Sequence, residues 1–178
     1  MNIPNLLTLS RIGLIPFFLY FLAEGRNTAA LIIFFIGSIT DALDGYLARK
    51  LGQITQMGKH LDPAADKIFL VTSYTAFYLL DMIPLWLFLI AILKDIVILA
   101  GLAALYLVIK VVEMRPTPEG KASTAFQMIT VLLILLQGVG IGYENILFAS
   151  MIITALLLFY SMVTYIFMGI NMYRESGT

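Results

Sequence analysis

Long apolar stretches separated by short polar connections run along the chain. Six of them reach the roughly 20 residues that an α-helix needs to cross the hydrocarbon core of a membrane. The pattern predicts helices over residues 4–23, 28–51, 61–80, 84–111, 118–139 and 144–172. Because the connections are short, we expect one bundle of six transmembrane helices, an all-α integral membrane protein with a single domain over residues 1–178.

The composition supports a lipid environment. Hydrophobic residues make up 61% of the 178 positions and charged residues only 12%, whereas a soluble domain carries about 25% charged residues. The net charge of zero argues against a nucleic-acid-binding surface. The absence of cysteine excludes disulfides and thiolate chemistry. The first apolar stretch is interrupted by polar residues and follows no basic leader, so we expect no cleavable signal peptide.

Basic residues gather at alternate connections. Those after the second and fourth predicted helices, with the adjoining helix ends, hold Arg49, Lys50, Lys59, Lys67, Lys110, Arg115 and Lys121, whereas the opposite connections hold only Arg26. Because cytoplasmic loops are enriched in Lys and Arg, we expect these connections and both termini on the cytoplasmic side. No organelle-targeting peptide is evident, so we expect a prokaryotic plasma membrane.

Four aspartates form the most conspicuous polar pattern. Asp41 and Asp44 are three residues apart at the end of one predicted helix, and Asp62 and Asp66 are four apart at the start of the next. Residues at such spacings share a helix face, so the four carboxylates are expected to converge. Oxygen ligands without His or Cys suit Mg²⁺ or Mn²⁺, and two such ions clamp a phosphoryl group. The alternative is surface pairing with neighbouring Lys and Arg.

Small residues accompany the aspartates. Gly45 and Ala48 lie on or beside the Asp41/Asp44 face and leave room for a flat ligand. Gly58 is expected at a turn of the connection. Pro63 is expected in the first turn of the predicted helix 61–80, where a missing N–H costs nothing.

The stretch from Asp41 to Asp66 reads D-x-x-D-G-x-x-A-R-x(8)-G-x-x-x-D-x-x-x-D. This pattern resembles the signature of the CDP-alcohol phosphatidyltransferase family, whose core is a six-helix membrane bundle. The resemblance implies transfer of a phosphatidyl group from CDP-diacylglycerol to an alcohol, with release of CMP. It implies that Asp41, Asp44, Asp62 and Asp66 bind two metal ions and that Asp66 is the general base. It also implies that Asp41, Gly45, Ala48 and Arg49 contact the CDP-lipid. It also implies a homodimer.

Other polar residues are candidates for substrate contacts. Asn5, Thr8 and Arg11 share a helix face and resemble the N-terminus of family members that make phosphatidylglycerophosphate or cardiolipin, which implies contact with the CDP-lipid. The alternatives are helix capping and an Arg that extends to the membrane surface. Lys94, followed by Asp95, lies inside an apolar stretch; it resembles the cation that helps the family bind an acceptor phosphate, with an internal ion pair as alternative.

The stretch G-K-x-x-T-x-x-Q from Gly120 to Gln127 also resembles those two branches of the family. It favours a small phosphorylated alcohol, glycerol 3-phosphate, as acceptor, bound by Lys94, Arg115 and Lys121. For Arg115 and Lys121 the alternative is surface charge that sets the topology. Phosphatidylglycerol as acceptor (a cardiolipin synthase), inositol phosphate and serine remain open within the family. Outside it, an intramembrane prenyltransferase and a cation transporter remain.

Overall fold

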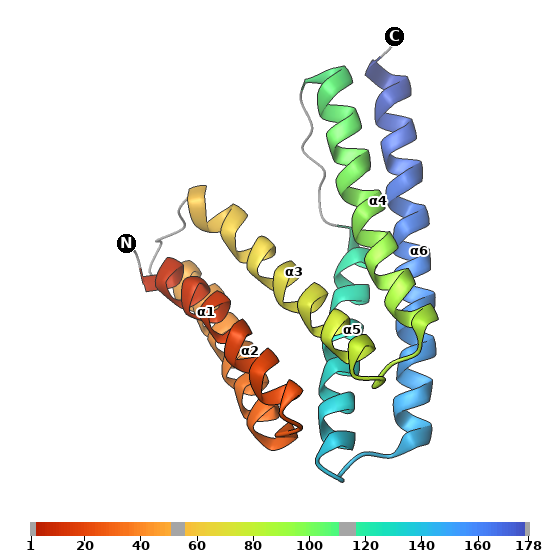
Figure 1. Cartoon of the computed structure of the whole chain (residues 1–178). Coiled ribbons are helices and arrows are strands. Elements are labelled where there is room, and N and C mark those ends of the chain that lie inside the picture. Colours follow the sequence, from red (N-terminus) through yellow and green to blue (C-terminus); the bar gives the residue numbers. More distant parts are fainter. Residues whose placement is uncertain (1–2, 51–55, 111–116, 177–178) are drawn as a thin grey trace. The chain divides into compact units, whose positions relative to one another are not determined.

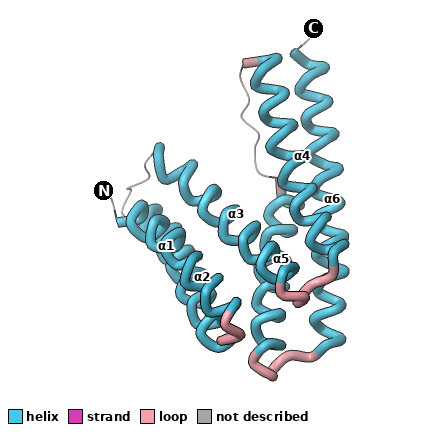
Figure 2. Tube along the Cα trace, in the orientation of Figure 1, coloured by secondary structure: helices cyan, strands magenta, loops and turns pink. Residues whose placement is uncertain are grey.

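The computed structural model describes residues 3–50, 56–110 and 117–176, and side chains for residues 9–40, 65–108, 110 and 117–175. Its helices are α1 (Ile3–Ala23), α2 (Asn27–Lys50), α3 (Gln56–Leu79), α4 (Leu85–Ile109), α5 (Pro118–Gly138) and α6 (Glu144–Ser176) (Figure 1). No strand occurs in these described ranges (Figure 2). The predicted all-α class is therefore confirmed.

Three of the described helical segments are long and apolar enough to cross a membrane. They are Leu85–Val108, Pro118–Gly138 and Glu144–Glu175. The described parts of α1 and α2 include shorter apolar segments, Leu9–Ala23 and Asn27–Thr40. Length and composition thus indicate a membrane protein, and the prediction of six crossings stays a prediction.

The chain forms two compact units. The first comprises Met1–Met82 and Val131–Tyr143, and the second comprises Ile83–Thr130 and Glu144–Thr178. In the first unit, α1 packs against both α2 and α3. In the second unit, α4 packs against α6. The prediction of a single domain is not tested by this division and stays a prediction.

Aromatic rings form the core of the first unit. Phe18 of α1 is fully buried, and its ring centroid lies 5.2 Å from that of Phe69 and 6.3 Å from that of Phe77 on α3. Phe34 of α2 lies 6.0 Å from Phe69, so this ring joins α2 to α3. The adjacent Phe17 is 59% exposed on the other side of α1. This alternation gives α1 one packed face and one face suited to lipid.

Hydroxyl groups join α5 to α6 in the second unit. The Oγ1 atoms of Thr130 and Thr154 lie 2.8 Å apart, and Thr154 Oγ1 also donates to the carbonyl of Phe126 at 3.2 Å. Ser150 lies 3.4 Å from Thr130 Oγ1. Interhelical hydrogen bonds of this kind contribute to helix association in lipid, where burial of apolar surface contributes little.

The third helix begins at Gln56, whereas the sequence predicted residue 61. Gly58 and Pro63 therefore both lie inside α3. Gly58 was predicted in a turn before the helix and Pro63 in its first turn, and both predictions were wrong. A proline inside a helix leaves the carbonyl four residues earlier without its usual N–H. The prediction failed because hydropathy marks where a helix meets lipid, and a polar first turn at a membrane surface is equally compatible with a helix.

We expect Phe18→Ala to lower the free energy of unfolding by about 2 kcal/mol, because the lost ring volume leaves a cavity between α1 and α3. The loss of transfer free energy, which adds to the cavity cost in a water-soluble protein, is small here because the unfolded chain is also surrounded by apolar solvent. Unfolding in mixed micelles with increasing denaturing detergent measures this change. Phe17→Ala is the matched control and should stay within about 0.5 kcal/mol; equal losses for the two variants would contradict the packing described above.

Candidate active site

The four aspartates of the sequence pattern lie on two helices of the first unit. Asp41 and Asp44 fall in the C-terminal part of α2, and Asp62 and Asp66 fall in the N-terminal half of α3. The predicted helical placement of both pairs is therefore confirmed. Of the four side chains, the structure describes that of Asp66.

A ring contact between α2 and α3 relates the levels of the two aspartate pairs. The two helices run in opposite directions within the first unit (Figure 1), and Phe34 meets Phe69. Asp41 follows Phe34 by seven residues, and Asp62 precedes Phe69 by seven. Seven residues are close to two helical turns, so positions 41 and 62 lie at the same level of adjoining helices.

Asp66 forms an ion pair with Arg11 of α1. The Arg11 Nη1 atom donates to Asp66 Oδ1. The Arg11 side chain is only 4% exposed and that of Asp66 27% exposed. Arg11 therefore does not extend to the membrane surface, and the alternative that the sequence suggested for this residue was wrong. Its guanidinium neutralises the carboxylate in the apolar interior, where an unpaired charge is costly.

This contact also relates the N-terminus of α1 to the aspartates. α1 and α3 run in the same direction within the first unit (Figure 1). Thr8 precedes Arg11 by three residues, and Asp62 precedes Asp66 by four. Position 8 therefore lies at about the level of position 62, one helical turn from the ion pair.

The donor set suits a hard divalent cation. It consists of carboxylates on adjoining helices, without the nitrogen or sulfur ligands of softer metals. The Asp66 side chain remains 27% exposed beside the ion pair. Within the described side chains no three acidic or histidine residues gather, and Asp41, Asp44 and Asp62 lie outside that set.

Lys94 occupies the interior of the second unit. It is 6% exposed although it lies in the apolar helix α4. Its Nζ lies 3.4 Å from Ser123 Oγ on α5 and 3.9 Å from Asp95 Oδ1. Gln127, one turn beyond Ser123, is also buried. The predicted inward orientation of the cation is confirmed, and both its pairing with Asp95 and a role in binding an anion fit this geometry.

Gly120 provides a close helix contact that the sequence motif did not reveal. A Cβ atom at this position would lie 2.9 Å from Tyr165 Oη on α6. The Gly120 N–H donates to Thr117 Oγ1 at 3.1 Å, which caps the start of α5. The glycine of the G-K pair therefore lets α6 approach the start of α5, next to Ser123. The only sequence signal was a glycine inside a helical turn.

Several candidate residues lie outside the described side chains: Asn5, Thr8, Asp41, Asp44, Gly45, Ala48, Arg49 and Asp62. Arg115 lies wholly outside the described residues. Lys121 is exposed near the start of α5, whereas Thr124 is half-buried. The roles predicted for these residues stay predictions.

Comparisons with known proteins extend these observations. The model of the CDP-alcohol phosphatidyltransferase family matches residues 1–172. A protein of Aquifex aeolicus named CDP-diacylglycerol–glycerol-3-phosphate 3-phosphatidyltransferase is 36% identical over 177 residues, 97% of this chain and 98% of its own length. A Haemophilus influenzae protein of that name is 49% identical over 75 residues, 40% of each chain. Human cardiolipin synthase (CMP-forming) is 38% identical over 101 residues, 56% of this chain and 34% of its own length.

We expect Arg11 and Asp66 to be coupled energetically. Arg11→Met and Asp66→Asn should each destabilise the chain, and the double variant should lose about 1–3 kcal/mol less than the sum of the two single losses. The reason is that each single variant leaves one charge in the interior without its partner. Unfolding in detergent measures all three variants. Arg26→Met, at an exposed cation, should show no coupling with Asp66→Asn; equal coupling energies would contradict a specific ion pair.

Proposed function

The chain belongs to the CDP-alcohol phosphatidyltransferase family, and we propose that it transfers a phosphatidyl group from CDP-diacylglycerol to glycerol 3-phosphate. The products are phosphatidylglycerophosphate and CMP. The observation that carries the proposal is the pair of aspartate motifs on adjoining helices, with Asp66 held by Arg11. The Aquifex aeolicus relative, named for this reaction, supports the choice of acceptor because it matches over nearly the full length of both chains.

Phosphatidylglycerol as acceptor is the second candidate. Its support is the similarity to proteins named cardiolipin synthase, including the human one. These matches cover a smaller share of this chain than the Aquifex aeolicus relative does. Glycerol 3-phosphate is therefore the preferred acceptor.

The proposed setting is a prokaryotic plasma membrane, crossed six times by one domain that works as a homodimer. The apolar helices α4, α5 and α6 support the membrane location. The Lys and Arg residues near the aspartates support an active site at the cytoplasmic face. There a water-soluble acceptor reaches the site from the cytosol, and the lipid donor reaches it from the bilayer.

Two Mg²⁺ or Mn²⁺ ions are proposed as cofactors, held by Asp41, Asp44, Asp62 and Asp66. The register fixed by Phe34 and Phe69 supports this, since it brings positions 41 and 62 to one level. When bound, such ions neutralise the charge that develops on the diphosphate. Gly45, Ala48 and Arg49, one to two turns beyond Asp41, and Asn5 and Thr8 of α1 are proposed to contact the CDP-lipid.

Asp66 is proposed as the general base. Its carboxylate accepts the proton of the acceptor hydroxyl, whose oxygen forms a bond to the lipid-side phosphorus of the donor. The bond from that phosphorus to the bridging diphosphate oxygen breaks, and CMP leaves with the electron pair. Arg11 donates to one carboxylate oxygen of Asp66, so the carboxylate is held in a defined orientation. A base must lie within hydrogen-bond reach of the proton that it accepts.

The acceptor phosphate is proposed to bind Lys94, Arg115 and Lys121. Lys94 is the best supported, because a cation inside an apolar helix requires an anionic or polar partner. Ser123 Oγ accepts from Lys94 Nζ at 3.4 Å and donates its own proton to the Gly120 carbonyl at 2.9 Å. Gln127 lies one turn further along α5 and is buried on that helix.

The first test measures CMP release from CDP-diacylglycerol by the purified protein with Mg²⁺ and one acceptor at a time. We expect release with glycerol 3-phosphate. Asp66→Asn should lower the rate by at least about 100-fold, since the amide cannot accept the proton. Asp81→Asn is the matched control; Asp81 lies in an exposed turn with a positive φ of 56°, which Asn also tolerates.

The acceptor series decides between the candidates. Release with phosphatidylglycerol alone would replace the proposed acceptor and establish the second candidate. Full activity of Asp66→Asn would contradict the role of the base. Absence of release with glycerol 3-phosphate, phosphatidylglycerol, inositol phosphate and serine, in a protein that folds and binds Mg²⁺, would contradict the proposed reaction.

We expect Lys94→Met to raise the KM for glycerol 3-phosphate about tenfold with a smaller effect on kcat, because it removes a charged hydrogen-bond donor from the phosphate. Lys94→Arg should retain part of the affinity. Initial rates at varied acceptor concentration separate the two constants. A fall in kcat with unchanged KM, matched by Asp95→Asn, would show instead that Lys94 serves only the ion pair with Asp95.

A further inference from the structure

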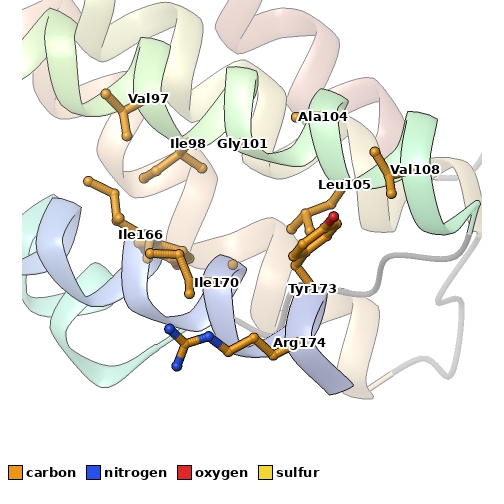
Figure 3. A pocket seen from close by; sticks show the side chains of 12 residues that line it. Val97, Ile98, Gly101, Ala104, Leu105, Val108, Ile166, Ile170, Tyr173 and Arg174 are labelled. Carbon is orange, nitrogen blue, oxygen red and sulfur yellow. The ribbon is translucent and has the colours of Figure 1, made fainter. Parts of the chain in front are cut away.

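An apolar groove lies between α4 and α6 of the second unit. It has a volume of about 510 Å³ and is lined by Ile98, Gly101 and Leu105 from α4 and by Ile166, Ile170 and Tyr173 from α6, among others (Figure 3). This volume lies within the range of roughly 300–1,000 Å³ that is usual for ligand pockets. Neither Lys94 nor Ser123 is among the described residues that line the groove.

A small residue on α4 keeps the groove open. A Cβ atom built at Gly101 would have no heavy atom within 4 Å, although Gly101 lies in the middle of a long apolar helix. Gly101 therefore makes no close helix contact of the kind seen at Gly120. Open apolar space of this kind, in a helix pair that crosses a membrane, is filled by hydrocarbon.

The length of the groove matches one leaflet of a bilayer. Its α4 wall runs from Val97 to Val108, and the eleven helical rises between these residues span roughly 16 Å at about 1.5 Å each. Half of the hydrocarbon core of a bilayer is about 15 Å thick. An extended acyl chain that lies along this wall thus reaches from the middle of the membrane to its surface.

Polar and basic groups mark one end of the groove. The C-terminal ends of α4 and α6 lie on the same side of the second unit (Figure 1). Tyr173 and Arg174 line the groove there. α4 ends at Ile109, and the next residue, Lys110, is its exposed C-cap. Aromatic residues, Lys and Arg are typical of the membrane surface. The two cations at this end, Lys110 and Arg174, outnumber the exposed Glu175 beside Arg174 among the described residues, which favours an anionic headgroup.

We propose that this groove binds one acyl chain of an anionic phospholipid, with the phosphate beside Arg174. The positive charge at this end of the groove favours a phospholipid as the occupant over a second copy of the protein. A lipid phosphate offers Arg174 and Lys110 an opposite charge at the membrane surface, whereas a two-fold contact places the same residues of each copy in one interface. The proposal rests on the membrane location alone and is independent of the acceptor and of the reaction.

The test uses phospholipids with a photoreactive group in one acyl chain, incorporated into vesicles with the full-length protein. Phosphatidylglycerol and phosphatidylcholine with identical chains are compared, and the labelled residues are located by mass spectrometry. We expect labels on α4 between Val97 and Val108 and on α6 between Tyr165 and Tyr173. Phosphatidylglycerol should label these segments about fivefold more than phosphatidylcholine, the effect of one basic residue near a lipid phosphate.

Variants at Gly101 and Arg174 separate binding of the acyl chain from binding of the headgroup. Gly101→Phe fills the groove and should remove the labels for both lipids, whereas Leu156→Phe, at an exposed position of α6 outside the groove, should leave them unchanged. Arg174→Gln should remove the preference for phosphatidylglycerol, and Arg174→Lys should keep it. Arg26→Gln controls for the loss of an exposed cation elsewhere.

Equal labelling by the two lipids, or labelling that survives Gly101→Phe in a protein with an unchanged thermal transition, would overturn the proposal. An unlabelled groove, together with a Gly101→Phe variant that changes from dimer to monomer by light scattering, would assign the groove to a second copy instead. If Gly101→Phe does not fold, the comparison of Arg174→Gln with Arg174→Lys still decides: equal lipid preference in the two variants overturns the proposal.

Discussion

Charge placed beside lipid must be matched by opposite charge within the protein, and the arrangement of the first unit depends on this constraint. The Born penalty for an isolated ion in an apolar medium is of order 20 kcal/mol before relaxation. Arg11 and Asp66 meet this constraint by forming an ion pair between α1 and α3. The pair connects the N-terminal helix to the aspartate motif through two residues, Arg11 and Asp66, that are 55 positions apart in the sequence. The carboxylate proposed as the base is thereby held in place by a different helix.

Helix association in lipid rests on packing and hydrogen bonds, because the lipid is as apolar as the side chains. The two units use different contacts between their helices. The first relies on the rings of Phe18, Phe34, Phe69 and Phe77. The second uses the Thr130–Thr154 hydroxyl pair and the close approach of Tyr165 to Gly120. The aromatic contact also sets the register of the aspartates, so packing and site geometry are linked in the first unit.

Among the described side chains, Arg11 and Lys94 are both buried cations, and they contact different partners. Arg11 neutralises a carboxylate of the signature motif. Lys94 lies near a hydroxyl and beside an acidic neighbour at the longer distance of 3.9 Å. The direct ion pair of Arg11 fits a role in positioning Asp66. The longer contacts of Lys94, 3.4 Å to Ser123 and 3.9 Å to Asp95, fit a role in binding an anion. Both roles serve the same proposed transfer.

The sequence by itself determined the helical class, the membrane character and the family, because hydropathy and the spacing of Asp41, Asp44, Asp62 and Asp66 are local properties of the chain. It also predicted that Lys94 faces inward, since a cation inside an apolar helix usually faces the interior of the bundle. The predicted start of α3 was wrong, because polar helical turns at a membrane surface carry no hydropathy signal. Only the tertiary structure decided that Arg11 pairs with Asp66, that Gly120 receives Tyr165, and that Gly101 opens a groove. Each of these depends on which helices become neighbours, which is fixed by side chains far apart in the sequence that meet only in the folded chain.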